Sequence, residues 1–136
     1  MLYKNPFPTV DCVIYTPGFG IVLVKRKNPP FGWALPGGFV DYGESVEKAA
    51  IREALEETSL HVKLTNLLGV YSEPDRDPRQ HTISTIFMAS ANNPHEINGQ
   101  DDALEAAYFP VNALPEEIAF DHAKVIADAI KKFQLV

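Results

Sequence analysis

The sequence is poor in cysteine and has no long apolar run. Cys12 is the only cysteine among the 136 residues, so no internal disulfide can form, which favours a reducing compartment. It lies in the apolar stretch TVDCVIY, where we expect a buried and inert thiol. No apolar run approaches the roughly 20 residues that a membrane-spanning helix requires, and the N-terminus lacks the pattern of a secretory signal. We therefore expect a cytoplasmic protein without a membrane partner.

The chain also has little positive charge. Lys and Arg number 12, against 18 Asp and Glu, and the formal net charge is -6. No basic patch stands out, which argues against a nucleic-acid-binding protein. If this acidic chain acts on a phosphate compound, a cation is needed to bridge the two negatively charged partners.

The apolar pattern predicts strands around two helices. Strand-like segments cover 10–15, 20–25, 39–40, 61–72, 81–91 and 104–111, and helices cover 44–58 and 122–133. Asp121 is placed to cap the second helix. Several strand pairs are linked too closely for helical crossovers, so we expect an α+β fold with a mixed sheet, in one domain of residues 1–136.

The predicted first helix concentrates negative charge. At about 100° per residue, Glu53 and Glu57 lie about 40° apart, Glu56 lies nearby, and Ile51 and Leu55 fall on the opposite side as an apolar face. Like charges at this spacing destabilise an isolated helix. Two interpretations stay open. One is a solvated acidic face, the usual state of glutamate; the other is a site for a divalent cation such as Mg²⁺, which prefers oxygen ligands.

The segment before this helix favours the cation site. Gly37 and Gly38 in LPGGFVDYGE permit close approach of the backbone to a ligand. We therefore expect this loop to direct backbone groups toward the same cation. Arg52 lies one turn before Glu56 and is placed to orient a carboxylate.

Residues 38–60 read G-x5-E-x7-R-E-A-x-E-E-x-S-L. This pattern resembles the Nudix box, G-x5-E-x7-R-E-U-x-E-E-x-G-U, where U is a bulky aliphatic residue, and the spacing agrees throughout. Ala54 is small for a U position, and Ser59 replaces a glycine that helps the helix to end, so the helix exit is hard to predict. The flanking segments GWALPGGFVDYGES and LEAAYFPVNALP also resemble Nudix domains, so the resemblance covers most of the chain.

The resemblance implies an α/β/α sandwich and the hydrolysis of a nucleoside diphosphate linked to another group. It also implies a cofactor, Mg²⁺, with Mn²⁺ as a substitute. The implied metal ligands are Gly38, Glu53, Glu56 and Glu57. Arg52 would orient these glutamates, and Glu44 would support the junction between loop and helix. Glu57 and Glu105 are both open as the general base.

The segment YSEPDRDPRQHTIS, residues 71–84, resembles the corresponding segment of ADP-ribose pyrophosphatases, and AFDHAKVI resembles the same branch. Arg76 and Arg79 would then contact phosphate or ribose oxygens. The alternative is a surface loop in which Asp75 and Asp77 neutralise these arginines.

Other substrate contacts are less constrained. Phe31, Trp33 and Tyr71 are candidates for an adenine slot, with core packing as the alternative. Arg26 either faces the substrate or belongs to a solvated edge with its lysine neighbours. We interpret three histidines as structural or exposed because they lack metal-ligand spacing; these are His81, His95 and His122.

The predicted function is therefore Mg²⁺-dependent hydrolysis of ADP-ribose to AMP and ribose 5-phosphate. One alternative is a house-cleaning pyrophosphatase of (d)NTPs or oxidised nucleotides. Another is a non-catalytic ADP-ribose sensor, which the complete set of box glutamates argues against. The family analogy also implies a homodimer.

Overall fold

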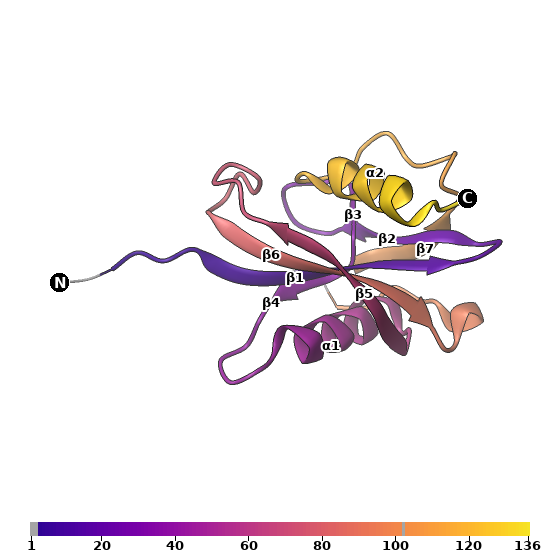
Figure 1. The fold of residues 1–136 in the computed structure, drawn as a ribbon, viewed down its shortest axis with the longest axis horizontal. Coiled ribbons are helices and arrows are strands. Elements are labelled where there is room, and N and C mark those ends of the chain that lie inside the picture. The colour runs from indigo at the N-terminus through magenta and orange to yellow at the C-terminus, as the bar shows by residue number, and fades with distance from the viewer. Residues whose placement is uncertain (1–2, 102) are drawn as a thin grey trace.

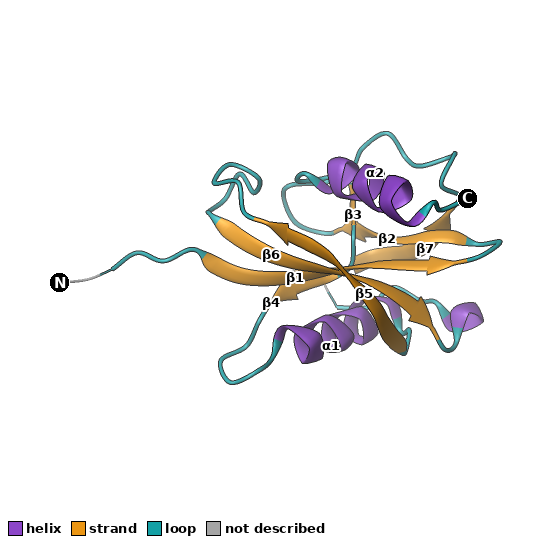
Figure 2. Ribbon diagram, viewed as in Figure 1, coloured by secondary structure: helices purple, strands orange, loops and turns teal. Residues whose placement is uncertain are grey.

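A twisted mixed sheet lies between two helices, α1 (Val46–Thr58) and α2 (His122–Phe133), which cover its opposite sides (Figure 1). The computed structural model describes residues 3–101 and 103–136. Over these residues the sheet has seven strands, and Figure 2 shows them as one central layer. The predicted α+β fold with a mixed sheet between helices is confirmed.

The strands pair in the order β3-β2-β1-β6-β5, with β4 added to β1 and β7 added to β2. Their bounds are β1 Phe7–Thr16, β2 Gly20–Arg26, β3 Trp33–Ala34, β4 Gly37–Phe39, β5 Val62–Tyr71, β6 Thr82–Ala91 and β7 Ala103–Phe109, with a short 3₁₀ helix at Pro94–Glu96. β1 runs parallel to β6, from Phe7 opposite Thr82 to Ile14 opposite Ala89, and the other pairs are antiparallel. β1 is therefore the strand that joins the two parts of the sheet.

Alternation along β1 divides the core into two layers. Cys12 and Ile14 pack on the side of α1, whereas Val13 packs with Val125 and Ile126 of α2. Successive side chains of a strand point to opposite faces, so this one strand contributes to both layers. The buried position of Cys12 agrees with the inert thiol expected from the sequence.

The predicted apolar face of α1 is wrong. Ile51 and Leu55 are exposed by 40% and 38%, whereas Ala49, Ala50 and Ala54 are almost fully buried. Small side chains let the helix backbone lie close to the sheet, so the alanine side of the helix is the one that packs. Glu53 and Glu57 share that side and consequently face inward.

Helix α1 begins later than predicted. Its C-terminal end shows how the helix can stop at Ser59 in place of the usual glycine. The helix begins at Val46, after Ser45, whose hydroxyl accepts a hydrogen bond from the Lys48 N–H at 3.1 Å. Ser59 takes the left-handed conformation, with φ of 64°, that glycine adopts most readily. Its hydroxyl donates to the carbonyl of Asn98 and accepts from Gln100, and these bonds hold the exit in place.

The start of α2 also departs from expectation. Asp121 stands at the N-cap position but makes no side-chain bond to the helix. Its carboxylate binds Arg76 instead, as described below. No helix formed by residues 3–101 and 103–136 is long and apolar enough to span a membrane.

The close approach of β2 to the end of β7 generates a stability prediction. A Cβ atom on Gly20 would overlap the Phe109 backbone, whereas one on Gly18 would meet open space, although both glycines have positive φ. We expect Gly18→Ala to lower the free energy of unfolding by about 1 kcal/mol, from backbone strain alone. Gly20→Ala should lose about 2–3 kcal/mol more in urea unfolding, because the backbones must separate. Equal losses for the two variants would contradict this packing.

Candidate active site

A pocket of about 390 Å³ opens beside α1 and is lined by groups of opposite charge. Its acidic residues are Asp11, Asp41, Glu53, Glu57 and Asp77, and its basic residues are Arg26, Arg76 and Arg79. Phe120, just before α2, and His122, the first residue of α2, form part of the wall. Residues from both helices, from strands and from connecting loops therefore meet in one cavity.

The turn before α1 lies directly against the glutamates of the helix. The Gly37 N–H donates to Oε1 of Glu57 at 2.8 Å. A Cβ atom on Gly38 would lie 2.6–2.7 Å from the carboxylate atoms of Glu53, so only glycine leaves room for this carboxylate. The loop and the helix are therefore fitted together at the two positions that carry the pocket glutamates.

Arg52 holds the acidic cluster together. It binds Glu44 in a bidentate manner, with Nε to Oε2 at 2.7 Å and Nη2 to Oε1 at 2.8 Å. Its Nη1 donates to Glu53 at 2.8 Å and to Glu56 at 3.3 Å, and its Nη2 also reaches the Phe39 carbonyl. The hydrogen bonds from Arg52 lower the pKa of Glu44 to about 2.

Burial dominates the chemistry of the two inward glutamates. It raises the pKa of Glu57 to about 8, and the charges of Glu53 and Asp11 add to this effect, while the Gly37 hydrogen bond opposes it. Burial also raises the pKa of Glu53, against the influence of Arg52. Partly desolvated carboxylates that repel each other favour either a proton or a cation.

This donor set fits a divalent metal ion. Carboxylate oxygens are ligands that hard cations prefer, and such ions keep further positions for water and phosphate. Within residues 3–101 and 103–136, however, no three acidic, His or Cys side chains already converge as a ready-made metal centre. Glu56 bonds to Arg52 and does not line the pocket, in keeping with its position further round the helix.

Arg76 and Arg79 have acidic partners, which differ in part from those expected. Arg76 is buried, and it donates to Thr82 and, in a bidentate manner, to Asp121. Asp77 pairs with Arg79, through bonds of 3.0 and 2.8 Å. The alternative interpretation, in which Asp75 and Asp77 neutralise the two arginines, therefore holds only for the pair of Asp77 and Arg79.

Several sequence candidates lie away from this pocket. Trp33 and Phe31 line a second pocket with Leu104, and the Tyr71 hydroxyl donates to Asp128 of α2. None of the three aromatic candidates for an adenine slot lines the main pocket. Glu105 is exposed on β7 opposite Lys25, and it is also outside the lining. Cross-strand partners share one face of a sheet, which places Glu105 beside Lys25.

Residues that the sequence reasoning missed form a polar network at the pocket wall. The Leu35 N–H donates to Nδ1 of His122 at 3.0 Å, so the neutral ring carries its proton on Nε2. This Nε2 lies 3.7 Å from Oδ2 of Asp11, which accepts a 2.6 Å hydrogen bond from Ser84. A charged residue inside the apolar run VDCVIY was the available signal for Asp11. For Phe120 and His122 the signal was the segment AFDHAKVI, whose resemblance to the ADP-ribose pyrophosphatase branch gave neither residue a role.

Comparison with known proteins now places the chain. A profile of the Nudix domain matches residues 5–129. An ADP-ribose pyrophosphatase of Methanocaldococcus jannaschii is 50% identical over 132 residues, which cover 96% of this chain and 76% of that protein. The chain therefore belongs to the Nudix family, and it is a Nudix hydrolase.

Two solved structures agree with this assignment. The NUDIX domain of Shewanella oneidensis NrtR, in complex with ADP ribose, has a TM-score of 0.80 at 26% identity, covering 96% of this chain and 90% of that one. A bifunctional NMN adenylyltransferase/ADP ribose pyrophosphatase from Francisella tularensis, complexed with AMP and a Mn ion, has a TM-score of 0.78 at 29% identity. The match covers 96% of this chain but 42% of the Francisella chain. Nudix hydrolases use a divalent metal, and that structure holds manganese.

The raised pKa of Glu57 predicts how stability depends on pH. In protein kept metal-free with EDTA, Glu57 holds its proton up to about pH 8 when folded but loses it near 4.5 when unfolded. The folded state thus binds more protons over this range, so the free energy of unfolding falls as pH rises from about 5 to 8, by a few kcal/mol.

Glu57→Gln stays neutral and should flatten most of this slope in urea unfolding measured at several pH values. A divalent cation added at pH 8 should restore stability to the wild-type protein, because it replaces the proton. A variant with the same slope as wild type would contradict the assignment to Glu57.

Proposed function

We propose that this protein hydrolyses ADP-ribose to AMP and ribose 5-phosphate in a reaction that depends on Mg²⁺. The observation that carries the proposal is the pocket itself, in which two half-buried glutamates, three arginines and the glycine turn line one cavity. The 50% identity to an ADP-ribose pyrophosphatase over nearly the whole chain supports the choice of substrate.

Glu53, Glu57 and the carbonyl of Gly38 would hold the cation, and Glu56 would join them when its side chain leaves Arg52. A bound Mg²⁺ supplies charge neutralisation at the diphosphate and lowers the pKa of a coordinated water. Arg52 orients Glu53 through its 2.8 Å bond and anchors the loop through Glu44.

Of the two candidates for the general base, Glu57 is the one that lines the pocket. Its Oε1 accepts the Gly37 N–H, which leaves Oε2 to take a proton from the attacking water. Glu105 has no part in the proposed reaction, because it lies outside the pocket lining.

The arginines would divide two tasks. Arg26 and Arg79 line the pocket and would bind phosphate oxygens, to which planar guanidinium groups are suited. Arg76 would stabilise this part of the pocket wall through its buried ion pair with Asp121. Trp33 lies in the second pocket and is not assigned to substrate.

Turnover of ADP-ribose tests this proposal. The wild-type protein with Mg²⁺ should release AMP, measured by chromatography, and Glu57→Gln should lower kcat by about 10²–10⁴-fold through loss of the base. Glu47→Gln is the matched control, since Glu47 is an exposed glutamate in the first turn of the same helix, and it should change kcat by less than about twofold.

A panel of (d)NTPs and oxidised nucleotides belongs in the same experiment. Higher kcat/KM for one of these compounds than for ADP-ribose would overturn the choice of substrate and favour the house-cleaning activity. Binding of ADP-ribose without any hydrolysis would favour a sensor.

A homodimer and a cytoplasmic location complete the proposal. The dimer rests on family analogy and is supported by Phe31 and Leu104, which are exposed by 65% and 64% and line the second pocket together. Sedimentation at micromolar concentration should give a dimer mass, and Leu104→Glu should shift it toward the monomer. A wild-type monomer would refute the dimer.

A further inference from the structure

Phe120 is a bulky residue in a strained backbone conformation. Its φ is 57°, in the left-handed region, where a residue with a Cβ is disfavoured by roughly 1–2 kcal/mol. Neighbouring backbone bonds fix this conformation: the Ala119 N–H donates to the Trp33 carbonyl at 2.8 Å, and the His122 N–H donates to the Ala119 carbonyl. The fold therefore tolerates strain at a residue that lines the candidate active site.

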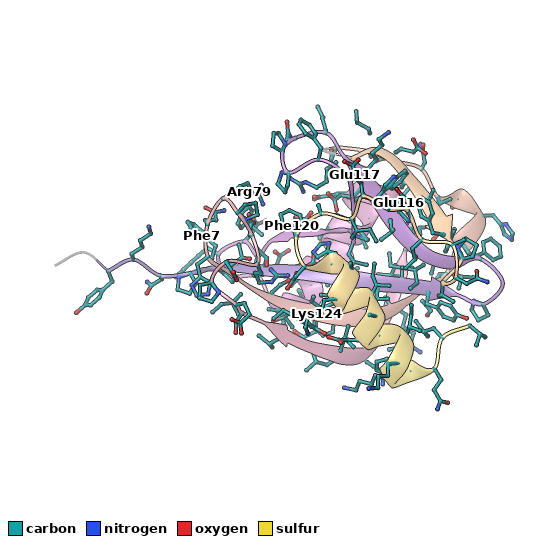
Figure 3. The ribbon with its side chains drawn as sticks, turned by 90° about the horizontal axis from the view of Figure 1, so that it is seen from above. Phe7, Arg79, Glu116, Glu117, Phe120 and Lys124 are labelled. Atoms are coloured by element: carbon teal, nitrogen blue, oxygen red, sulfur yellow. The ribbon has the colours of Figure 1, made fainter. Side chains whose placement is uncertain are left out.

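The conformation places the phenyl ring among three pocket residues. The Cζ atom of Arg26 lies 4.8 Å from the ring centroid and that of Arg79 lies 5.4 Å from it. The ring of His122 packs against the same phenyl group, with centroids 5.1 Å apart. Figure 3 shows Arg79 and Phe120 beside each other, from the loop before β6 and from the chain that enters α2.

The two arginines reach this ring from distant parts of the chain. Arg26 ends β2, whereas Arg79 lies in the loop between β5 and β6. Each guanidinium also donates a hydrogen bond from its edge: Arg26 to the Pro30 carbonyl at 2.7 Å, and Arg79 to Asp77. A guanidinium that stacks on an aromatic ring keeps its N–H groups in its own plane, where they remain able to bind an anion.

The positive charges around the ring suit a diphosphate. The charge of Arg26 lowers the pKa of both Glu57 and Asp77, and all three residues line the same pocket as Arg79. A cation held by Glu53 and Glu57 would draw a phosphate to this position. The arginines on Phe120 are then placed at the neighbouring phosphate oxygens.

We propose that Phe120 is a positioning residue, whose ring fixes Arg26 and Arg79 to receive the phosphate oxygens of a nucleoside diphosphate joined to a sugar. This inference rests on the proposed function. The left-handed backbone conformation lets the ring reach both arginines. Substrate binding therefore favours this conformation, whereas its strain lowers the stability of the fold.

Three variants separate these demands. Phe120→Leu removes the aromatic ring but retains an apolar side chain. Without the ring, neither guanidinium is held by a cation–π interaction, so the KM for ADP-ribose should be about tenfold higher, with kcat within about twofold. Phe120→Tyr keeps the ring and should restore the wild-type KM. Phe120→Gly relieves the strain, so it should raise KM like the leucine variant while its thermal midpoint is no lower than that of Phe120→Leu.

A double-variant comparison tests whether the ring acts through the arginines. In an Arg79→Ala background, Phe120→Leu should raise KM by clearly less than it does in the wild-type background, because one of its two partners is gone. Full additivity would mean that Phe120 does not act through Arg79 and would overturn the inference. So would an unchanged KM in Phe120→Leu, or a KM as high in Phe120→Tyr as in Phe120→Leu.

Binding provides a readout that does not depend on turnover. Calorimetric titration of ADP-ribose into the metal-free protein, kept in EDTA so that no turnover occurs, should give a Kd that rises about tenfold when Phe120→Leu is introduced. An unchanged Kd overturns the inference alone. Absence of both ADP-ribose turnover in the wild-type protein with Mg²⁺ and ADP-ribose binding in the metal-free protein overturns the proposed function and the inference together.

Discussion

The guanidinium of Arg52 is the interaction on which the rest of the site depends. It joins Glu44 and the Phe39 carbonyl, both in the chain before α1, to Glu53 and Glu56 on the helix. These groups would otherwise repel one another, and the planar fork of arginine is suited to hold several carboxylates at once. With the loop held in this way, the glycine turn lies against the helix at the positions of the pocket glutamates.

Close packing of α1 is the second constraint. Ala49, Ala50 and Ala54 place the helix backbone near the sheet, and Gly38 leaves no side chain between the turn and Glu53. The glutamates are consequently held where water is scarce, and burial raises the pKa of Glu57 and Glu53. The geometry that disfavours the negative charge of these carboxylates in the metal-free protein also makes them good ligands for a cation. The crowding of glutamates on this helix thus has a chemical purpose in the proposed reaction.

Local patterns in the sequence were sufficient for the fold class, for most strands and for the family. The glutamates of the box lie close together in sequence, so their spacing on a helix could be read directly. The face of the helix that packs could not be read from the sequence. Hydrophobicity favoured Ile51 and Leu55, whereas the close approach of the helix to the sheet requires the alanines. Residue size, rather than polarity, decided the orientation.

The rest of the pocket depends on contacts between distant segments. Asp11 is distant in sequence from Phe120 and His122. These residues meet only when β1 and the start of α2 are brought together. Asp121 shows the same limit: it has the sequence of a helix cap, but the buried guanidinium of Arg76 takes its carboxylate. Glu105 and Trp33 were plausible by chain position, and the pairing of β7 and β3 with β2 leaves them outside the pocket lining.

The central claim is that the inward glutamates and the glycine turn hold a divalent cation. Anomalous diffraction from crystals soaked in Mn²⁺ tests it most directly, because manganese is located by its own signal. The account predicts a peak about 2.0–2.2 Å from carboxylate oxygens of Glu53 and Glu57, close to the Gly38 carbonyl and absent from Glu57→Gln crystals. A peak elsewhere in the pocket, or one that persists unchanged without the Glu57 carboxylate, would contradict it.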